Sequence, residues 1–232
     1  MNKADIIKLL KEGGDINQRN KEGKTALYIA TETNNLDLLI FLLKNKADPN
    51  IESLQITFSG KLTEGQTALC KAVENNATEA VTTLLQYGAE VNKVGEINLS
   101  PLCIAIGSSN LPMVQLLLEH KANPNQILFE STSPFFMAVT IGDIKITKLL
   151  LDSNADLTQE IQQQTALDKL YTVNPPLRKM LEKATAEQKA LTTQITQRRP
   201  SLDLSPKIML QTHTERLLKA EQEKISGCCL VM

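Results

Sequence analysis

The residues best suited to chemistry stand at the end of the chain, which reads Cys229-Leu-Val-Met232. A cysteine followed by two aliphatic residues and a final Met is the pattern of a CaaX box, in which the cysteine thiolate attacks a prenyl diphosphate. A final Met favours a farnesyl over a geranylgeranyl group. The pattern therefore predicts prenylation of Cys229, with a prenyltransferase as a partner. The alternative is an unmodified apolar chain end.

A single lipid chain binds a membrane only marginally, so a second signal is expected nearby. Residues 185–232 contain seven basic and five acidic residues, which do not make a polybasic segment. The neighbouring Cys228 is the better candidate, as a site of reversible palmitoylation. The two cysteines together predict a membrane as a partner, reached through lipid.

A third candidate for modification is Ser201, which follows Arg198, Arg199 and Pro200. Arginines two and three positions before a serine resemble the sites of basophilic kinases, so the pattern predicts phosphorylation. The alternative is an exposed serine that is never modified.

Catalytic and metal chemistry lack the residues that they need. The chain has two His, and it has no Gly-x-x-x-x-Gly-Lys-Ser/Thr loop, no Gly-x-Ser-x-Gly and no Cys-x-x-Cys. Its 25 basic and 26 acidic residues give a net charge of -1, which disfavours nucleic acid as a partner. We therefore expect no catalytic residue, metal or cofactor, and an enzyme of unfamiliar type is the remaining alternative.

The rest of the chain is organised by repetition, which is best sought before local structure. Of the residues 42% are apolar and 3% are aromatic, a composition that suits packed helices. One marker is a Thr or Ser followed by Ala or Pro and then Leu or Phe, with spacings of 42, 33, 33 and 32 residues. It begins at Thr25, Thr67, Ser100, Ser133 and Thr165. A second marker, a Leu pair, recurs in step at Leu9, Leu42, Leu84, Leu117 and Leu150.

The markers make physical sense as pairs of helices. Each Thr or Ser is a preferred N-cap, and Pro or Ala suits the first helical position. Nine residues later a tight turn needs left-handed backbone, which Gly or Asn supplies at four of five positions. These positions are Asn34, Asn76, Ser109, Gly142 and Asn174. The Leu pairs then lie on the inner face of each second helix.

This pattern resembles the ankyrin repeat, a β-turn and two antiparallel helices with a period near 33. The resemblance covers residues 1 to about 185 and implies an all-α solenoid of helix-turn-helix units with β-hairpin loops. We place this domain at 1–184, with a capping helix at 1–13 and repeats that start near 23, 65, 98, 131 and 163. The last helix is expected to begin at Pro175 and end near Ala184. Residues 185–232 form a helical or flexible tether that carries the CaaX box.

The chain departs from the family pattern where the family favours a His after the Leu. Apolar packing is expected to replace the usual polar network at Tyr28, Cys70, Cys103, Phe136 and Asp168. The resemblance also implies that Asn17 and Asn92 hydrogen-bond across their loops. Hydroxylation of these two asparagines by an oxygenase is a further modification that the resemblance implies.

Two loops carry apolar residues where polar ones are expected. The segment from Asn50 to Thr67 is nine residues longer than the equivalent segments in the first, third and fourth loops. Within it, apolar and polar residues alternate over 54–63 around Ser59-Gly60, which predicts a protruding β-hairpin finger. A second apolar run occupies residues 127–129. Exposed apolar patches usually mark contact sites, and we predict partner contacts at Ile56, Phe58, Leu62, Leu128 and Phe129. The alternative is a finger that packs these side chains on its own repeat.

Ankyrin families generally bind proteins, so the resemblance implies a monomer that binds a host or cellular protein on its concave, loop-bearing face. The N-terminus does not read as a signal peptide, and the longest apolar stretch, residues 36–43, is too short to span a bilayer. We expect a protein tethered at the cytoplasmic face of membranes in a eukaryotic cell. The chain is rich in Asn, Gln, Ile, Lys and Thr and has no Trp, a composition that resembles the products of AT-rich genomes. In this combination of features it is similar to ankyrin effectors that intracellular bacteria secrete into host cells. The alternative is a soluble eukaryotic ankyrin-repeat adaptor with no lipid anchor.

Overall fold

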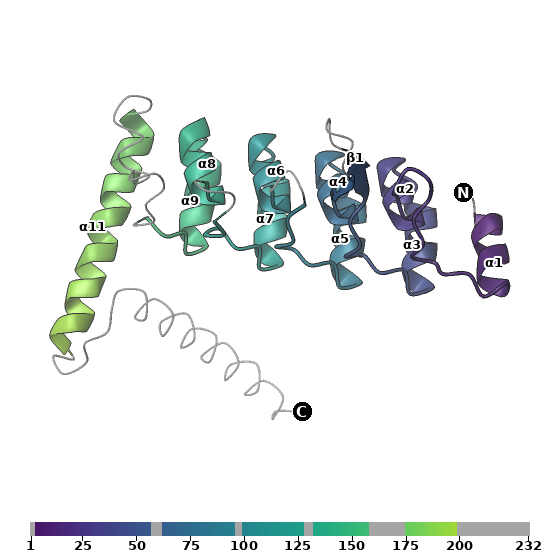
Figure 1. Cartoon of the computed structure of the whole chain (residues 1–232). Coiled ribbons are helices and arrows are strands. Elements are labelled where there is room, and N and C mark those ends of the chain that lie inside the picture. Colours follow the sequence, from purple (N-terminus) through teal and green to yellow (C-terminus); the bar gives the residue numbers. More distant parts are fainter. Residues whose placement is uncertain (1–2, 57–61, 96–98, 128–131, 158–174, 199–232) are drawn as a thin grey trace, which may run out of the picture. The chain divides into compact units, whose positions relative to one another are not determined.

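A computed structural model describes residues 3–56, 62–95, 99–127, 132–157 and 175–198 of the 232-residue chain (Figure 1). The chain divides into two compact units, residues 1–179 and residues 180–232. The described repeats belong to the first unit. The predicted fifth repeat start near 163, with Thr165, Asp168 and Asn174, lies outside the described residues.

Pairs of antiparallel helices follow one another along the chain. After α1 (Lys3–Lys11), the pairs are α2 (Ala26–Glu32) with α3 (Leu36–Lys44), α4 (Ala68–Glu74) with α5 (Thr78–Gln86), α6 (Pro101–Gly107) with α7 (Leu111–Glu119), and α8 (Pro134–Ile141) with α9 (Ile144–Asp152). Two short strands, β1 (Leu54–Ile56) and β2 (Leu62–Glu64), stand between the first two pairs. Each first helix packs on the first helix of the next pair, α2 on α4, α4 on α6 and α6 on α8. The predicted all-α solenoid of helix-turn-helix repeats is therefore confirmed.

The repeat markers start and turn the helices as predicted. The hydroxyl oxygens of Thr25, Thr67, Ser100 and Ser133 each accept a hydrogen bond from the backbone N–H three residues later. In the turns, Asn34, Asn76 and Gly142 have φ of 51°, 54° and 83°. Ser109 also has a positive φ, 51°, although serine rarely adopts it. The turn geometry is therefore the same in all four described pairs, whatever the residue type.

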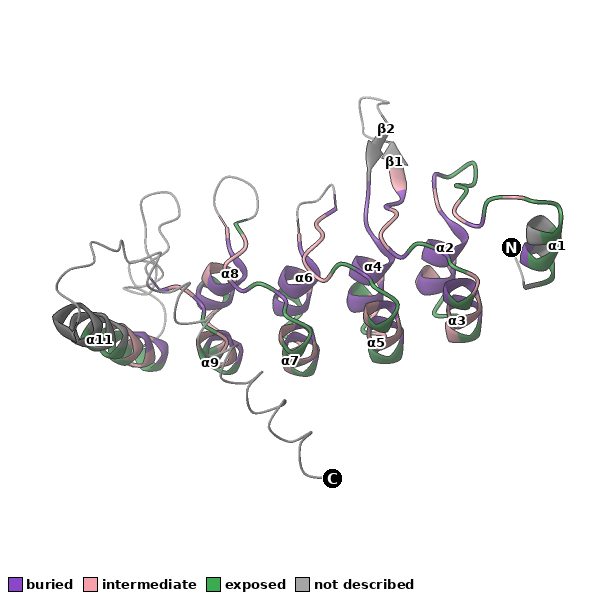
Figure 2. Ribbon diagram, turned by 90° about the horizontal axis from the view of Figure 1, so that it is seen from below, coloured by how far each residue is buried: buried purple, intermediate pink, exposed green. Residues whose placement is uncertain are grey.

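The core consists of aliphatic side chains shared between neighbouring pairs. The first Leu of each described pair in the second helices, Leu42, Leu84, Leu117 and Leu150, is completely buried. Leu43 is also buried, whereas Leu85, Leu118 and Leu151 are half-buried. The first helices contribute Leu27, Leu69, Leu102 and Phe135, each 1–2% exposed. Figure 2 shows this burial running along the row of first helices.

The predicted end of the last helix, near Ala184, is wrong. The helix α11 begins at Pro175 as expected, but it continues past Ala184 and runs to Arg198. Residues 177–198 contain no Gly or Pro that would stop a helix, and Pro200 is the next such residue. No change of secondary structure therefore marks position 184, and the division into a 1–184 domain and a tether stays a prediction.

Candidate protein-binding surface

The loops between repeats are joined by a series of asparagine bridges. Each of four asparagines accepts, through its side-chain Oδ1, a hydrogen bond from a backbone N–H in the next loop, over 2.7–2.8 Å. The bridges run from Asn17 to Asp48, from Asn50 to Glu90, from Asn92 to Asn123 and from Asn125 to Asp156. Three of these side chains also donate from Nδ2 to a carbonyl of the following loop. The expected cross-loop role of Asn17 and Asn92 is thus seen, and Asn50 and Asn125 share it.

The finger is fixed at its base by close backbone contacts with the loops on both sides. The Leu54 N–H donates to the Gly23 carbonyl over 2.8 Å. Gly23 has φ of +75°, and any Cβ there would collide with the Leu54 side chain. On the other side, a Cβ at Gly95 would collide with the Gly65 carbonyl. These two glycines therefore let three successive loops lie against one another.

Charged side chains reinforce the same base. The Arg19 guanidinium donates two hydrogen bonds, 3.0 and 3.2 Å long, to the carbonyl of Glu52. The Lys93 ammonium donates to the Asn50 carbonyl over 2.9 Å and lies 3.3 Å from the Glu52 carboxylate. Glu52 is 9% exposed, so this ion pair is better shielded from water than a surface pair. The base of the finger is therefore held by these hydrogen bonds and this ion pair.

The finger itself is an antiparallel pair of strands, as the sequence predicts. In its register Leu54 lies opposite Glu64, Gln55 opposite Thr63 and Ile56 opposite Leu62. The strands project from the layer of first helices on the side away from α5 (Figure 2). The structure thus brings together two of the predicted contact residues, Ile56 and Leu62. Phe58, Leu128 and Phe129 lie outside the described residues, and the contact role of all five stays a prediction.

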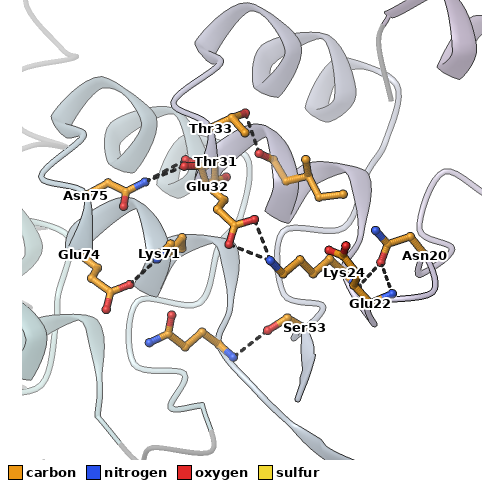
Figure 3. A network of polar contacts seen from close by, with 12 residues as sticks. Asn20, Glu22, Lys24, Thr31, Glu32, Thr33, Ser53, Lys71, Glu74 and Asn75 are labelled. Atoms are coloured by element: carbon orange, nitrogen blue, oxygen red, sulfur yellow. Dashed lines mark hydrogen bonds and ion pairs between the residues drawn. The ribbon is translucent and has the colours of Figure 1, made fainter. Parts of the chain in front are cut away.

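Sequence reasoning missed the charged face that α2 and α4 present next to the finger. The Lys24 ammonium binds both carboxylate oxygens of Glu32, at 2.8 and 2.9 Å, and the Lys71 ammonium binds Glu74 at 2.8 Å. Figure 3 shows Glu32 and Lys71 on the neighbouring helices, with Asn75 reaching back to the end of α2. The hydrogen bond with Glu32 is the main reason why the pKa of Lys24 is raised. Glu32 and Glu74 each stand seven residues after an N-cap, but only the packing of α2 on α4 brings Glu32 near Lys71.

The positions where the family favours His are filled mainly by buried apolar groups, as expected. Tyr28, Cys70 and Cys103 are at most 5% exposed, and Phe136 is half-buried. Burial raises the pKa of the Cys103 thiol to about 11 and raises that of Cys70 as well. Neither thiol is therefore a ready nucleophile at neutral pH.

The predicted modification sites at the chain end, Ser201, Cys228 and Cys229, lie outside the described residues. Within the described ranges, no group of three or more His, Cys, Asp or Glu side chains is placed to hold a metal ion. No helix in that part of the chain is both long enough and apolar enough to cross a membrane.

A row of helix pairs that share their cores and carry rigid loops along one edge defines a repeat scaffold for protein–protein interaction. The chain matches the family described as ankyrin repeats (3 copies) over residues 1–95, 51–127 and 93–161, and it belongs to that family. It is 38% identical over 78 residues to the B-cell lymphoma 3 protein homolog of Mus musculus, a match that covers 34% of this chain. It is 36% identical over 84 residues to an ankyrin repeat protein of Rickettsia felis, covering 36% of this chain. The matches span 16% and 25% of the length of these relatives.

Proposed function

We propose that this chain is an adaptor that binds one protein partner along its finger and first helices, and that prenylation of Cys229 holds it at a membrane. The observation that carries the binding role is the continuous row formed by α2, α4, α6 and α8 with the loops joined by asparagine bridges. A surface fixed in this way loses little conformational entropy when a partner binds. Ankyrin repeats are protein-interaction modules, which supports the same role.

Partner contacts are assigned first to the finger. Ile56 and Leu62 face each other in its register, and Phe58 lies between them in the sequence. In the loop between α7 and α8, Ile127 is 64% exposed and immediately precedes Leu128 and Phe129. A few anchor residues carry most of the binding free energy in protein interfaces.

The membrane role rests on the chemistry of Cys229. Prenylation requires Met232 to be the last residue of the mature chain, and it supplies one lipid. Palmitoylation of Cys228 would add the second lipid that stable anchoring needs. The protein would then act at the cytoplasmic face of membranes in a eukaryotic cell.

We further propose that the chain is a bacterial effector that acts in a host cell. The similarity to the Rickettsia felis protein supports this origin, as does a composition rich in Asn, Gln, Ile, Lys and Thr without Trp. A translocation assay, with the chain fused to a reporter in a secreting bacterium, should find reporter activity in the host cytosol. Reporter activity that never leaves the bacterium would contradict the effector role.

The membrane role is tested by expressing the chain, tagged at its N-terminus, in eukaryotic cells. The wild type should incorporate a labelled farnesyl analogue and sediment with membranes, whereas Cys229→Ser should do neither. Cys228→Ser should still take up the farnesyl label but bind membranes more weakly. Equal membrane association of the wild type and Cys229→Ser would refute the lipid anchor and leave a soluble adaptor.

The binding role of the finger is tested separately, with a Phe58→Asp, Phe129→Asp double variant. The variant should keep its helical circular dichroism and lose partner proteins that co-purify with the wild type from eukaryotic lysate. A matched variant with Lys44→Asp and Lys145→Asp changes exposed residues on the second helices α3 and α9 and should keep those partners. Retention of every partner by the Phe double variant would exclude the finger and loop tips as contact sites.

A further inference from the structure

The outward side chains of the first helices lie at two positions, each of which recurs at the same distance from the N-cap in every helix. The fourth residue after each N-cap is half-buried, and the seventh is half-buried or exposed. The fourth positions are Ile29, Lys71, Ile104 and Met137, and the seventh positions are Glu32, Glu74, Gly107 and Thr140. Because all four helices start from the same kind of cap, these positions can be compared directly.

The seventh position of one helix lies next to the fourth position of the following helix. Between α2 and α4, Glu32 is close enough to Lys71 for its charge to help raise the pKa of that ammonium, after the larger effect of the Glu74 hydrogen bond. Figure 3 shows these two side chains on adjacent helices. Between α6 and α8, a Cβ on Gly107 would lie 3.2 Å from the terminal methyl carbon of Met137. Gly107 and Met137 are therefore the counterparts of Glu32 and Lys71.

The two ends of this face differ in charge. Over α2 and α4, Lys24 forms an ion pair with Glu32 and Lys71 forms one with Glu74, each with an N–O distance of 2.8 Å. The helices α6 and α8, by contrast, contain no Asp, Glu, Lys or Arg. Ile104 and Met137 are half-buried there, and Ile141 at the end of α8 is 45% exposed. With no side chain at Gly107, an approaching chain can reach closer to α6 than to α2 or α4.

We propose that α6 and α8 bind an uncharged, apolar stretch of the partner protein, and that Gly107 determines this specificity. Charge complementarity supports this assignment. A charged partner residue would lose its hydration against α6 and α8 and find no counter-charge on them, which disfavours it strongly. Over α2 and α4, the same partner meets both positive and negative side chains. Polar residues of the partner are therefore expected to bind at this end of the face. This inference rests on the proposed binding role and specifies the chemistry of the partner.

The test uses a library of random 12-residue peptides displayed on phage and selected on the immobilised full chain. Peptides enriched by the wild type should share a run of at least five uncharged, mostly apolar residues. A synthetic copy of the best peptide should bind Gly107→Glu at least tenfold more weakly. The fold accepts Glu at this position in α2 and α4, and the Met137 methyl end can move aside. A Gly107→Glu, Met137→Lys variant recreates the Glu32 and Lys71 arrangement and should lose binding in the same way while remaining folded.

Gln86→Glu is the matched control, because it adds the same charge at an exposed position on the second helix α5 and should bind the peptide as the wild type does. Enriched peptides as charged as the starting library, or equal affinity for the wild type and the two Gly107 variants, would overturn the inference and leave the binding role intact. A wild type that enriches no peptide would count against both the inference and the proposed binding role.

Discussion

At the scale of single residues, four loops each carry an asparagine at the equivalent position that joins one repeat to the next. Asn17, Asn50, Asn92 and Asn125 each bridge to the backbone of the following loop. A side-chain amide suits this place because it offers an acceptor and two donors, and backbone groups in loops need both. The bridges hold the loop edge in a fixed register, which is what a binding surface built from loops requires.

Replacing one of these asparagines should weaken the whole stack. Asn50→Ala removes the acceptor for the Glu90 N–H and the donor to the Gly88 carbonyl, which are 2.8 and 3.1 Å away. We expect the free energy of unfolding to fall by about 0.5–1.5 kcal/mol, the typical net contribution of an intramolecular hydrogen bond. Urea unfolding followed by circular dichroism measures this change. Lys44→Ala, at an exposed helix end, is the control, and an equal loss in both variants would mean that the bridge contributes nothing.

One helix lacks the cap that its equivalents have. Asn35 and Asn110 cap α3 and α7, whereas Ala77 precedes α5 and makes no cap hydrogen bond. The backbone of Ala77 (φ -88°, ψ 77°) nevertheless matches that of Asn35 (φ -87°, ψ 82°). Ala77 also lines a groove of ≈ 360 Å³, which leaves room for a longer side chain.

Ala77→Asn should therefore stabilise the protein by about 1 kcal/mol, the typical contribution of an N-cap. The reciprocal variant, Asn35→Ala, should destabilise it by a similar amount, since its Oδ1 caps the Leu38 N–H at 3.0 Å. Both changes are read from urea midpoints. An Ala77→Asn variant no more stable than the wild type would show that the backbone match does not suffice for capping.

At the scale of elements, the finger depends on how closely its base approaches the preceding loop. Gly23 and Gly13 have almost the same φ, +75° and +76°, but only Gly23 faces Leu54 across a contact with no room for a Cβ. An Ala at either position pays for left-handed backbone, about 1–2 kcal/mol. An Ala at Gly23 must also push the finger aside.

Gly23→Ala should therefore cost about 1–3 kcal/mol more than Gly13→Ala, as overpacking usually does. The difference between the two variants cancels the backbone cost and isolates the contact with the finger. Chemical unfolding gives both values, and hydrogen exchange of the Leu54 N–H should accelerate in Gly23→Ala alone. Equal losses of stability would show that the finger does not pack on this loop.

Much of the element structure could be predicted because the signals were local and repeated. The hydroxyl caps, the turn at Asn34 and the finger strands each follow from a few neighbouring residues. The end of α11 does not follow the period of the repeat, because residues 177–198 are a helix-forming sequence without Gly or Pro. The charged face of Glu32 and Lys71 was missed for a different reason. It arises between residues 39 positions apart, and only the packing of α2 on α4 brings them together.

At the scale of the whole molecule, each repeat depends on its neighbours and the row of first helices is the consequence. The repeat helices α2 to α9 are seven to nine residues long, too short to be stable alone. Burying Leu between successive pairs therefore creates, in the same step, a row of outward positions in fixed register. One end of that row is charged and the other is apolar.

The most direct test of the binding face is a scan with a photo-crosslinking amino acid, placed at single positions in the full chain and activated in eukaryotic cells. Substitution at Lys71 or Met137, on the first helices, should give discrete crosslinked adducts with a cellular protein. Substitution at Gln86 or Gln115, exposed on the second helices α5 and α7, should give none. Adducts formed at the second-helix positions and absent from Lys71 and Met137 would contradict the account.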